Sequence, residues 1–517
     1  MTLRSGSGFR MEPSGFRWNP VECAGGSRHA LPRRHRLGGH GKLRGLIGLE
    51  ICSIRGLHST PMRFWSLIVV LVVAASLTGS RGVAADTVDA PSVDALTASA
   101  RRAELRVLAG DHLVLVTDRP AREGDGVEDL PRIFDEAWSA WCAHYALDPA
   151  AHREWRAFGC LVVDRERFRA AGLLPEKIPD FANGHCSNHR FWMADQSNPA
   201  YRRHLLLHEG VHAFTLTLRS LDTPPWYTEG IAECLATHRL DDDDTNHDPK
   251  GKTVRFVSTP LPLRAADVEQ LGRIEKIRAL RAAGECPGLD DIFTTPGANH
   301  RDLSAYAGSW AAVAMLSRHP RHATAFAAAE RGPLDRNFNR RLSEATGWDG
   351  DHAERDFDAF TDEIDYGYDF TRSGIDWTPA PARPLDSRQT ISVAADRGWQ
   401  NSGWSLRKGA RYSLQATGRC TIGTLTAPAA EPPLQLETEA DGISLRWYRG
   451  RPLGRLLVAQ WVENPDDGGR PRFVVVAEGG RCEFTALTDG TVFCKLNEPP
   501  GELADNDGKL TVEINLE

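Results

Sequence analysis

The chain has 517 residues, of which 41% are hydrophobic and 25% are charged, and its formal net charge is -7. This length exceeds one compact core, so the sequence predicts two or three domains. Residues 86–517 carry 50 Lys and Arg against 66 Asp and Glu, which argues against nucleic acid as a partner.

The N-terminal residues have the pattern of a processed segment. From Met62 the sequence reads "MRFWSLIVVLVVAASLTGSRGVAAD", in which one arginine precedes an apolar run and small residues end at Ala84-Ala85. This layout is typical of a signal peptide over residues 62–85 and is too short for a membrane span. It predicts a secreted or periplasmic protein without a transmembrane span in the mature chain. Residues 1–61 lack periodicity, and we interpret them as an over-called, disordered leader, with a long leader or an N-terminal anchor as the alternative.

The next part of the chain has a mixed pattern. Residues 86–100 are polar and predict an N-terminal tail. In residues 101–375, His112 to Asp118 and Gly159 to Phe168 have strand-like runs, and Leu130 to Leu147 has helical apolar spacing. Mostly helical patterns follow. The sequence therefore predicts an α+β domain over residues 101–375 that is mostly helical around any site it carries.

The C-terminal part is separated by a proline-rich stretch. Residues 376–390, "DWTPAPARPLDSRQT", contain three prolines and predict a stiff linker. After it, short apolar runs alternate with clusters of Gly, Pro, Asn and Asp. Residues 391–517 therefore predict an all-β domain of the jelly-roll or sandwich type, and the whole chain a multidomain protein.

Eight cysteines follow the predicted cleavage point, and outside the cytoplasm they can form disulfides. No C-x-x-C pair is present, which argues against a cysteine zinc site. Cys482 and Cys494 flank "CEFTALTDGTVFC", which resembles a hairpin. They are the best candidates for a disulfide, although two buried thiols fit the pattern equally well.

The stretch "RHLLLHEGVHAF", from Arg203 to Phe214, contains an H-E-x-x-H motif. On a helix, His208 and His212 lie one above the other and can aim their imidazoles at one metal ion. Glu209 lies about 100° around the helix from His208, so its carboxylate is placed beside the metal as a general base. The alternative is an amphipathic helix with hydrogen-bonded histidines. His204 is one turn earlier, and we favour a surface position for it.

A catalytic zinc ion needs a third protein ligand and an open fourth position. The following segment, "PPWYTEGIAECLATH", offers Glu229 near the start of a second helix. Glu233 lies one turn further on the same face and is suited to orient a ligand imidazole through its second nitrogen. His238 is a rival third ligand, and an acid that interacts with the helix dipole is the alternative for Glu229.

The segments "HEGVH" and "WYTEGIAE" together resemble the gluzincin metallopeptidases, including the aminopeptidase N group of peptidase MA-like enzymes. The resemblance covers Leu205 to Leu240 closely and residues 101–375 loosely. It implies Zn²⁺ on His208, His212 and Glu229, with Glu209 as general base. It also implies that Tyr306, in "AYAGSWAAVAML", stabilises the oxyanion, or else is a core aromatic.

The aminopeptidase group carries a G-x-M-E-N segment upstream that holds the free amine of the substrate. The corresponding residues here, Phe181 to Pro199, lack it. The resemblance therefore implies an exported metallopeptidase that hydrolyses peptide or protein substrates, without implying aminopeptidase specificity.

Near the C-terminus, "LNEPPGELADNDGKLTVEI" places oxygen-bearing side chains on a turn before a strand, which suits Ca²⁺ or an ion-free Asx-rich turn. Together with the rest of residues 388–517, this stretch resembles the calcium-dependent galactophilic lectin domain of bacteria. The resemblance implies a calcium site at Glu498, Asp505 and Asn506, with the carbonyl groups of Glu502 and Ile422. Residues 385–517 contain no histidine, whereas that family uses one for sugar. Glycans and a non-binding accessory role are therefore both open.

The sequence supports two functions. The first is an exported zinc peptidase with a lectin-like accessory domain, in which Glu209 deprotonates the water that attacks the peptide bond. The second is an inactive peptidase fold that serves as a carbohydrate- or surface-binding protein. The presence of the base together with all three candidate ligands favours the enzyme.

Overall fold

The computed structural model describes residues 91–242, 254–268, 272–296, 303–381, 389–425 and 434–517. All of these residues belong to one compact unit, Thr87–Glu517. The predicted leader and signal peptide lie outside the described residues. None of the described helices combines the length and the apolar character that crossing a membrane requires.

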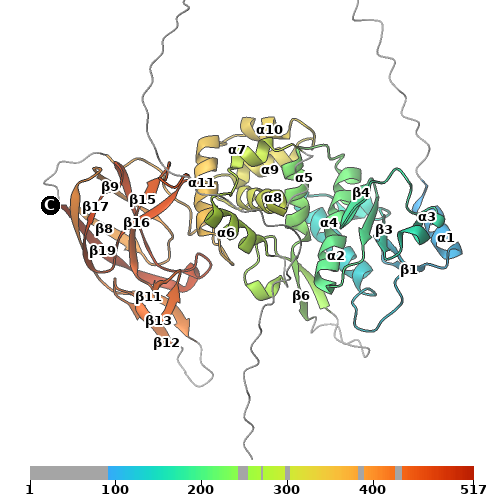
Figure 1. Cartoon of the computed structure of the whole chain (residues 1–517), viewed down its shortest axis with the longest axis horizontal. Helices are drawn as coiled ribbons and strands as arrows, with labels where there is room; N and C mark the ends of the chain where they lie inside the picture. The colour runs from blue at the N-terminus through green and yellow to red at the C-terminus, as the bar shows by residue number, and fades with distance from the viewer. Residues whose placement is uncertain (1–90, 243–253, 269–271, 297–302, 382–388, 426–433) are drawn as a thin grey trace, which may run out of the picture. The chain divides into compact units, whose positions relative to one another are not determined.

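A five-stranded sheet begins this unit (Figure 1). Its strands are β1 (Arg106–Ala109), β2 (Leu113–Thr117), β3 (Ala157–Val162), β4 (Gly184–Ser187) and β5 (Arg190–Ala194), in the order β1-β2-β3-β5-β4. β2, β3 and β5 are parallel, and β1 and β4 pair antiparallel at the two edges. Every residue of β2 and β3 is buried, because both faces of the sheet are covered. The strand predicted at His112 to Asp118 is confirmed.

The segment predicted as a tail is helical from Val93 onward. Helix α1 (Val93–Arg102) begins after Ser92, whose hydroxyl accepts a hydrogen bond from the backbone N–H of Ala95 at 3.2 Å. Leu96 and Ala100 are buried in a small core with α3 (Arg165–Ala170) on one face of the sheet. The tail prediction for residues 86–100 is therefore wrong for these residues, because two apolar side chains one turn apart give the helix a buried stripe.

The other face of the sheet packs against a helical core. Its helices are α2 (Leu130–His144), α4 (Pro199–Leu218), α5 (Pro225–Ala236), α6 (Arg273–Ala283), α7 (Leu289–Thr294), α8 (Leu303–Leu316), α9 (Ala323–Arg331), α10 (Phe338–Glu344) and α11 (Gly350–Glu363). A hairpin of β6 (His238–Asp242) and β7 (Val254–Ser258) follows α5. One continuous hydrophobic cluster joins the sheet, α2, α4, α5 and α8. The mixed, mostly helical pattern predicted for residues 101–375 is confirmed.

Two backbones approach closely where α5 crosses α8. A Cβ atom on Gly230 would lie 2.4 Å from the carbonyl oxygen of Ser309. A backbone carbonyl cannot move aside as a flexible side chain does, so only glycine allows this contact. Gly230 follows Glu229 directly, and its small size therefore sets how near α5 comes to the helix that carries Tyr306.

The described residues from 389 onward form two large β-sheets and a separate two-stranded one, and the predicted β-structure is confirmed. One contains β8 (Gln389–Ala394), β10 (Arg411–Thr417), β11 (Cys420–Leu425), β12 (Leu434–Thr438), β17 (Arg481–Thr485) and β19 (Asn506–Leu516). The other contains β9 (Gln400–Leu406), β15 (Leu456–Val462), β16 (Arg472–Glu478) and β18 (Gly490–Leu496), and β13 (Ile443–Tyr448) pairs with β14 (Arg451–Leu453). Side chains of both sheets, such as Leu414 and Val458, share one core, which makes the arrangement a sandwich.

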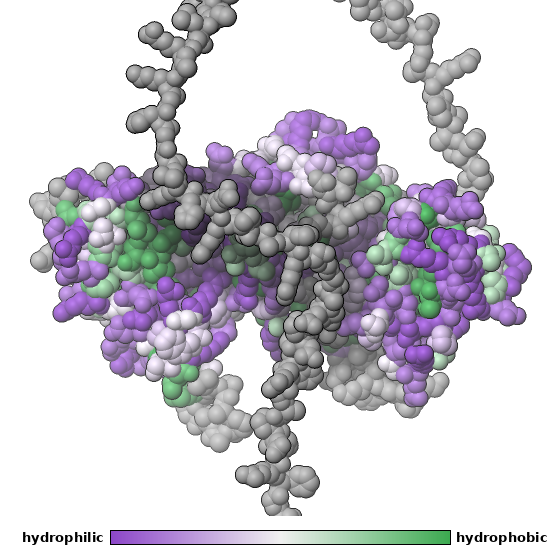
Figure 2. All heavy atoms as spheres, viewed as in Figure 1, coloured by the Kyte–Doolittle hydropathy of each residue, from purple (hydrophilic) through white to green (hydrophobic). Residues whose placement is uncertain are grey.

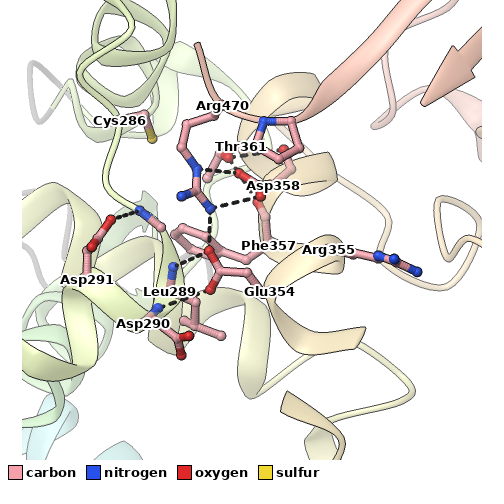
Figure 3. Close-up of polar contacts among 12 residues, drawn as sticks. Cys286, Leu289, Asp290, Asp291, Glu354, Arg355, Phe357, Asp358, Thr361 and Arg470 are labelled. Carbon is pink, nitrogen blue, oxygen red and sulfur yellow. Dashed lines mark hydrogen bonds and ion pairs between the residues drawn. The ribbon is translucent and has the colours of Figure 1, made fainter. Parts of the chain in front are cut away.

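Helix α11 contacts the β-sandwich through a polar cluster (Figure 3). The Nε and Nη2 atoms of Arg470 each donate to Asp358 at 2.9 Å, and Arg470 also binds Glu354. Glu354 in turn accepts the backbone N–H groups of Leu289 and Asp290 at 3.2 and 3.0 Å, which caps the start of α7. The figure shows Arg470 reaching between these acidic groups, so the cluster ties the sandwich to two helices at once.

The predicted linker, residues 376–390, is described at its start and at Gln389 and Thr390, which already belong to β8, whereas residues 382–388 lie outside the described residues. The side chain of Trp377 is buried beside Phe473 and Phe493 of the β-sandwich. Its indole N–H donates to the Asp356 carboxylate at 2.8 Å. The segment that follows α11 therefore packs against both that helix and the β-sandwich. The position of the domain boundary remains a prediction.

The disulfide prediction is wrong. All eight described cysteines are free thiols, including Cys482 and Cys494. Cys482 lies on β17, which pairs with β10, whereas Cys494 lies on β18, which pairs with β15 and β9. The two strands that look like a hairpin in sequence belong to different sheets, so the cysteines are not cross-strand partners.

Hydrophilic residues cover most of the visible face of the described chain, with smaller apolar areas between them (Figure 2). The most exposed large apolar side chains include Leu445 and Trp447, both on β13, at 87% and 59% exposure. Single exposed apolar residues are common on protein surfaces.

Candidate metal centre

The two histidines of the H-E-x-x-H motif lie on one face of α4. The helix begins after Asn198, whose side-chain oxygen accepts the backbone N–H groups of Ala200 and Tyr201. His208 and His212 are one turn apart and buried, and their Nε2 atoms lie 3.1 Å from each other. Two imidazole nitrogens therefore point at the same position beside the helix.

Helix α5 brings the third predicted ligand to this position. The Oε2 atom of Glu229 lies 3.3 Å from Nε2 of His208 and 3.4 Å from Nε2 of His212. Two ligand atoms of a tetrahedral zinc ion with bonds of about 2.0–2.1 Å lie about 3.3–3.4 Å apart. The three atoms thus form a triangle of the size that one face of a zinc tetrahedron requires, as predicted for His208, His212 and Glu229.

One atom of this triangle has no other partner. Oε2 of Glu229 is buried and accepts no hydrogen bond from the described residues. Buried carboxylate oxygens are rarely left unpaired, because their desolvation is costly. The orphaned oxygen and the N/N/O donor set both fit a metal ion such as Zn²⁺.

A second layer supports His208 from behind. Oε1 of Glu233 lies 3.3 Å from Nδ1 of His208, as expected for a carboxylate that orients a ligand imidazole. His204 is only 3% exposed, and its Nε2 lies 3.4 Å from Glu233 Oε2. The surface position favoured for His204 is therefore wrong, because Glu233 and Arg273 close over this part of α4.

The rival ligand His238 is directed elsewhere. Its Nδ1 lies 2.7 Å from the Ala236 carbonyl oxygen, and its Nε2 lies 2.7 Å from Nε of Arg203. It belongs to none of the groups whose ligand atoms converge among the described residues. Glu229 is therefore the third residue of the triangle.

The electrostatics of the centre favour positive charge. Burial disfavours a charged His208, but the carboxylates of Glu229 and Glu233, each 3.3 Å from one of its ring nitrogens, outweigh this and raise the pKa of His208 to about 10. Burial also acts on Glu229, yet His212 and His208 hold the pKa of its carboxyl far below its ordinary value. Without a metal ion, the nearby carboxylates stabilise a proton on the His208 imidazole. A divalent cation would compensate the same negative charge.

The predicted base and the predicted oxyanion residue both lie beside the triangle. Glu209 is 6% exposed, and a Cβ atom on Gly184 of β4 would lie 2.2 Å from its Oε1 atom. Burial raises the pKa of the Glu209 carboxyl, which brings it nearer to the range suited to a general base. The ring of Tyr306 on α8 lies 6.1 Å from the ring of His208.

These groups open on one cleft. Its volume is about 410 Å³, and its lining includes His208, Glu209, Tyr306 and residues 179–185 before and within β4. Arg273, on α6, also lines it. Neither Arg273 nor Gly184 is marked by a motif, because each is brought to the centre from a distant part of the sequence. Among the residues around His208, the sequence marks only Glu233 and His204, through their helical spacing.

A second group of potential ligands, His319, His322 and Asp356, serves a different purpose. Nε2 of His322 lies 2.7 Å from Oδ2 of Asp356. The same carboxylate oxygen accepts Arg321 at 2.5 Å, and its other oxygen accepts Trp377. An arginine on the carboxylate repels a metal ion, so Asp356 acts as a structural anchor between α11 and the start of the predicted linker.

The predicted calcium residues come together only in part. Asn506 donates its side-chain amide to Oε2 of Glu498, and Ile422 faces Asn506 across the β11–β19 pairing. Oε1 of Glu498 and Oδ1 of Asn506 are buried without a hydrogen-bond partner among the described residues. Burial raises the pKa of the Glu498 carboxyl to about 8.

The other two predicted calcium residues have protein partners. Oδ2 of Asp505 accepts the backbone N–H of Thr424 at 3.1 Å. The side chain of Glu502 pairs with Arg446 at 2.6 Å, which leaves its carbonyl group as the part predicted to bind an ion. Two orphaned oxygens are therefore the structural feature that favours a cation here.

Comparisons with known proteins give little further information. No family model matches the chain, and no curated protein matches it. Among solved structures, the N-terminal domain of EclA, a PllA-like lectin, is 19% identical, covers 25% of this chain and 95% of its own, and has a TM-score of 0.17. PliG from Aeromonas hydrophila, a periplasmic inhibitor of g-type lysozyme, is 6% identical, with coverages of 25% and 85% and a TM-score of 0.12. At these TM-scores neither likeness carries an argument about fold or function.

Proposed function

We propose that residues 101–375 form a zinc-dependent peptidase. The observation that carries this proposal is the triangle of His208 Nε2, His212 Nε2 and Glu229 Oε2, with distances of 3.1 to 3.4 Å. Glu209 stands outside the triangle and beside it, on the wall of the cleft. Three ligands with a separate carboxylate are the arrangement that hydrolysis of peptide bonds uses.

The residues of the chain have distinct roles in this reaction. A zinc ion supplies Lewis acidity and lowers the pKa of water bound to it. Glu209 accepts the proton of the attacking water and later donates it to the leaving amine. Burial raises the pKa of Tyr306, so its hydroxyl stays protonated at neutral pH and can donate a hydrogen bond to the oxyanion.

The position of β4 supports an extended peptide as substrate. β4 is the last strand of the sheet order and pairs only with β5 among the described strands. Gly184 of this strand contacts Glu209, so the free edge runs alongside the base. An exposed strand edge offers backbone N–H and C=O groups to an added strand. A peptide bound there would pass its scissile bond near Glu209.

The proposal predicts one zinc ion per chain and hydrolysis that depends on it. Zinc would be counted in the purified chain, and turnover of a denatured, fluorescently labelled protein would be followed before and after chelation. We expect chelation to reduce hydrolysis to background and added zinc to restore it. Zinc binding without any chelator-sensitive hydrolysis would instead favour the inactive, surface-binding protein.

We propose export as the cellular setting of this activity. The support is the sequence of residues 62–85, with its apolar run and small residues before Ala85. The enzyme would then be secreted or periplasmic. N-terminal sequencing of the exported protein checks this, and a mature chain that still contains residues 62–85 would contradict it.

As a second function, we propose that the C-terminal sandwich binds a calcium ion as a lectin-like accessory domain. The support is the pair of buried oxygens without partners, Glu498 Oε1 and Asn506 Oδ1. Calcium prefers such oxygen ligands, and a cation would compensate the buried carboxylate. Glycan binding through such an ion is a further step of the same proposal.

The calcium proposal predicts a difference between two neighbouring glutamates. Calcium at about 100 times its dissociation constant stabilises the folded chain by about 2.7 kcal/mol, so the melting temperature should rise. Glu498→Gln should lose this rise, and without calcium it should melt no lower than the unchanged protein, because a neutral amide replaces a buried carboxylate. Glu502→Gln is the matched control and should keep the calcium response, since only its carbonyl group is involved. Equal responses in both variants would refute the site.

A further inference from the structure

The Glu233 carboxylate connects the metal centre to an arginine from another part of the chain. Its Oε1 atom faces Nδ1 of His208 at 3.3 Å. Its Oε2 atom accepts two N–H groups of Arg273, from Nε at 2.9 Å and from Nη2 at 2.7 Å. The two oxygens of one carboxylate are thus divided between the imidazole and the guanidinium.

Glu233 has a second possible partner. Nε2 of His204 lies 3.4 Å from the same Oε2 atom that binds Arg273, and both ring nitrogens of His204 lack a full hydrogen bond among the described residues. A carboxylate released by Arg273 can therefore turn toward His204. That rotation would take Oε1 away from His208, and Nδ1 of that imidazole would lose the carboxylate that faces it.

Arg273 is held firmly in its place. It is the first residue of α6 and follows Gly272, whose φ of 58° lies in the left-handed region that glycine favours. The same helix is fixed further along, where Arg278 binds Asp365 at 2.5 Å and Arg281 binds Asp358 at 3.1 Å. The side chain of Arg273 is 15% exposed. A planar guanidinium that donates twice to one oxygen from an anchored helix restricts the carboxylate more than a flexible ammonium does.

We propose that Arg273 is a positioning residue for the metal centre. It holds Glu233 so that Oε1 stays beside Nδ1 of His208, 3.3 Å away, and Nε2 of that imidazole is the nitrogen left for the metal. The inference rests on the proposed zinc site and extends it to a residue far away in the sequence. Side chains that contact a metal ligand typically contribute 10–100-fold in metal affinity. Arg273 acts through such a side chain, Glu233.

The test measures zinc affinity rather than turnover. The full-length chain and its variants would be titrated with zinc in competition with a chromophoric chelator. Arg273→Met should bind zinc about 10–100-fold more weakly, and Arg273→Lys should recover part of the loss, because it keeps the charge without the fork. Lys276→Met is the matched control, because it removes a cation from the same helix without removing a contact that anchors it, and it should bind zinc as the unchanged chain does. Melting of the zinc-free variants shows whether each remains folded.

A double-variant cycle separates positioning from a general loosening of the fold. Glu233→Gln alone should weaken zinc binding, and adding Arg273→Met to it should cause no further loss, because Arg273 acts through that carboxylate. The visible spectrum of the cobalt-substituted chain should change in Arg273→Met and stay unchanged in Lys276→Met. Independent, multiplicative losses in the double variant would overturn the proposal.

Two other results would also overturn it, and they are distinguishable. Unchanged zinc affinity in Arg273→Met, with a change only in KM for peptide, would show that Arg273 binds substrate in the cleft that it lines. If the unchanged chain binds no zinc, the proposed function fails together with this inference. If the unchanged chain and Arg273→Met bind zinc equally, only this inference fails.

Discussion

Replacing Glu209 with glutamine is expected to lower kcat by about 10²–10⁴-fold, the usual contribution of a general base, while zinc stays bound. The reason is the position of the side chain. Glu209 belongs to none of the converging ligand groups, whereas His208 and His212 on either side of it do. Glutamine has nearly the same shape, so the contact with Gly184 of β4 is preserved. Only the capacity to accept a proton is lost.

The measurement compares Glu209→Gln with Glu229→Gln. Each variant replaces one carboxylate of the metal centre, but the first should lose turnover and the second should lose zinc. If the proposed activity holds, Glu209→Gln should keep one zinc ion per chain and a KM close to that of the unchanged chain. Glu229→Gln should lose zinc first, because a neutral amide replaces an anionic ligand. A Glu209→Gln variant that keeps its turnover, or that loses zinc, would contradict the proposal that Glu209 is the general base.

The metal triangle could be predicted because its geometry is largely local. Residues four apart on a helix face the same direction, so the sequence alone placed the imidazoles of His208 and His212 together. Glu229 comes from the next helix after a short connection, and its place near the start of that helix made it the candidate for the third ligand. The distances of 3.1 to 3.4 Å agree with both steps.

Behind the triangle, the spacing of Glu233 predicted its place beside His208, but the burial of His204 and the contact with Arg273 could not be predicted in the same way. The spacing of His204 fits a buried position as well as an exposed one. The choice depends on Glu233 and on Arg273, which arrives from α6 some 40 residues further along. No periodicity connects an arginine at the start of one helix with a glutamate in the middle of another. The sequence therefore does not show that α6, an element distant along the chain, helps to bury His204.

The C-terminal part shows the same limit for strands. Alternating apolar residues and turn signals predicted β-structure after residue 390, and the sandwich agrees with this. The alternation does not determine with which other strand each strand pairs. Residues 486–489 join β17 to β18, yet each of these strands pairs in a different sheet. A cysteine bridge across them was expected only because a hairpin is the commonest connection of this length.

The second large effect is expected where the sandwich meets the end of α11. The ammonium group of Lys495, on β18, forms an ion pair with Glu363, and both side chains are largely buried, at 6% and 13% exposure. Arg449 approaches the same carboxylate at 3.2 Å, and the Trp399 ring lies 4.8 Å from the ammonium. Burial lowers the pKa of Lys495 even with Glu363 beside it, so the lysine depends on this partner to remain charged.

Removing Glu363 and removing Lys495 should therefore lower the free energy of unfolding by different amounts. Glu363→Gln should cost about 3–5 kcal/mol of unfolding free energy, because it leaves the buried Lys495 without a counter-charge. Lys495→Met should cost less, because Glu363 keeps its ion pair with Arg449. The double variant should recover most of the loss, since an amide and a thioether are far cheaper to bury than an unpaired ammonium. Urea unfolding of the full-length chain measures all three. If the two losses simply add in the double variant, the pair is not coupled and the sandwich is held on α11 by its other contacts, foremost the Arg470 cluster with Asp358.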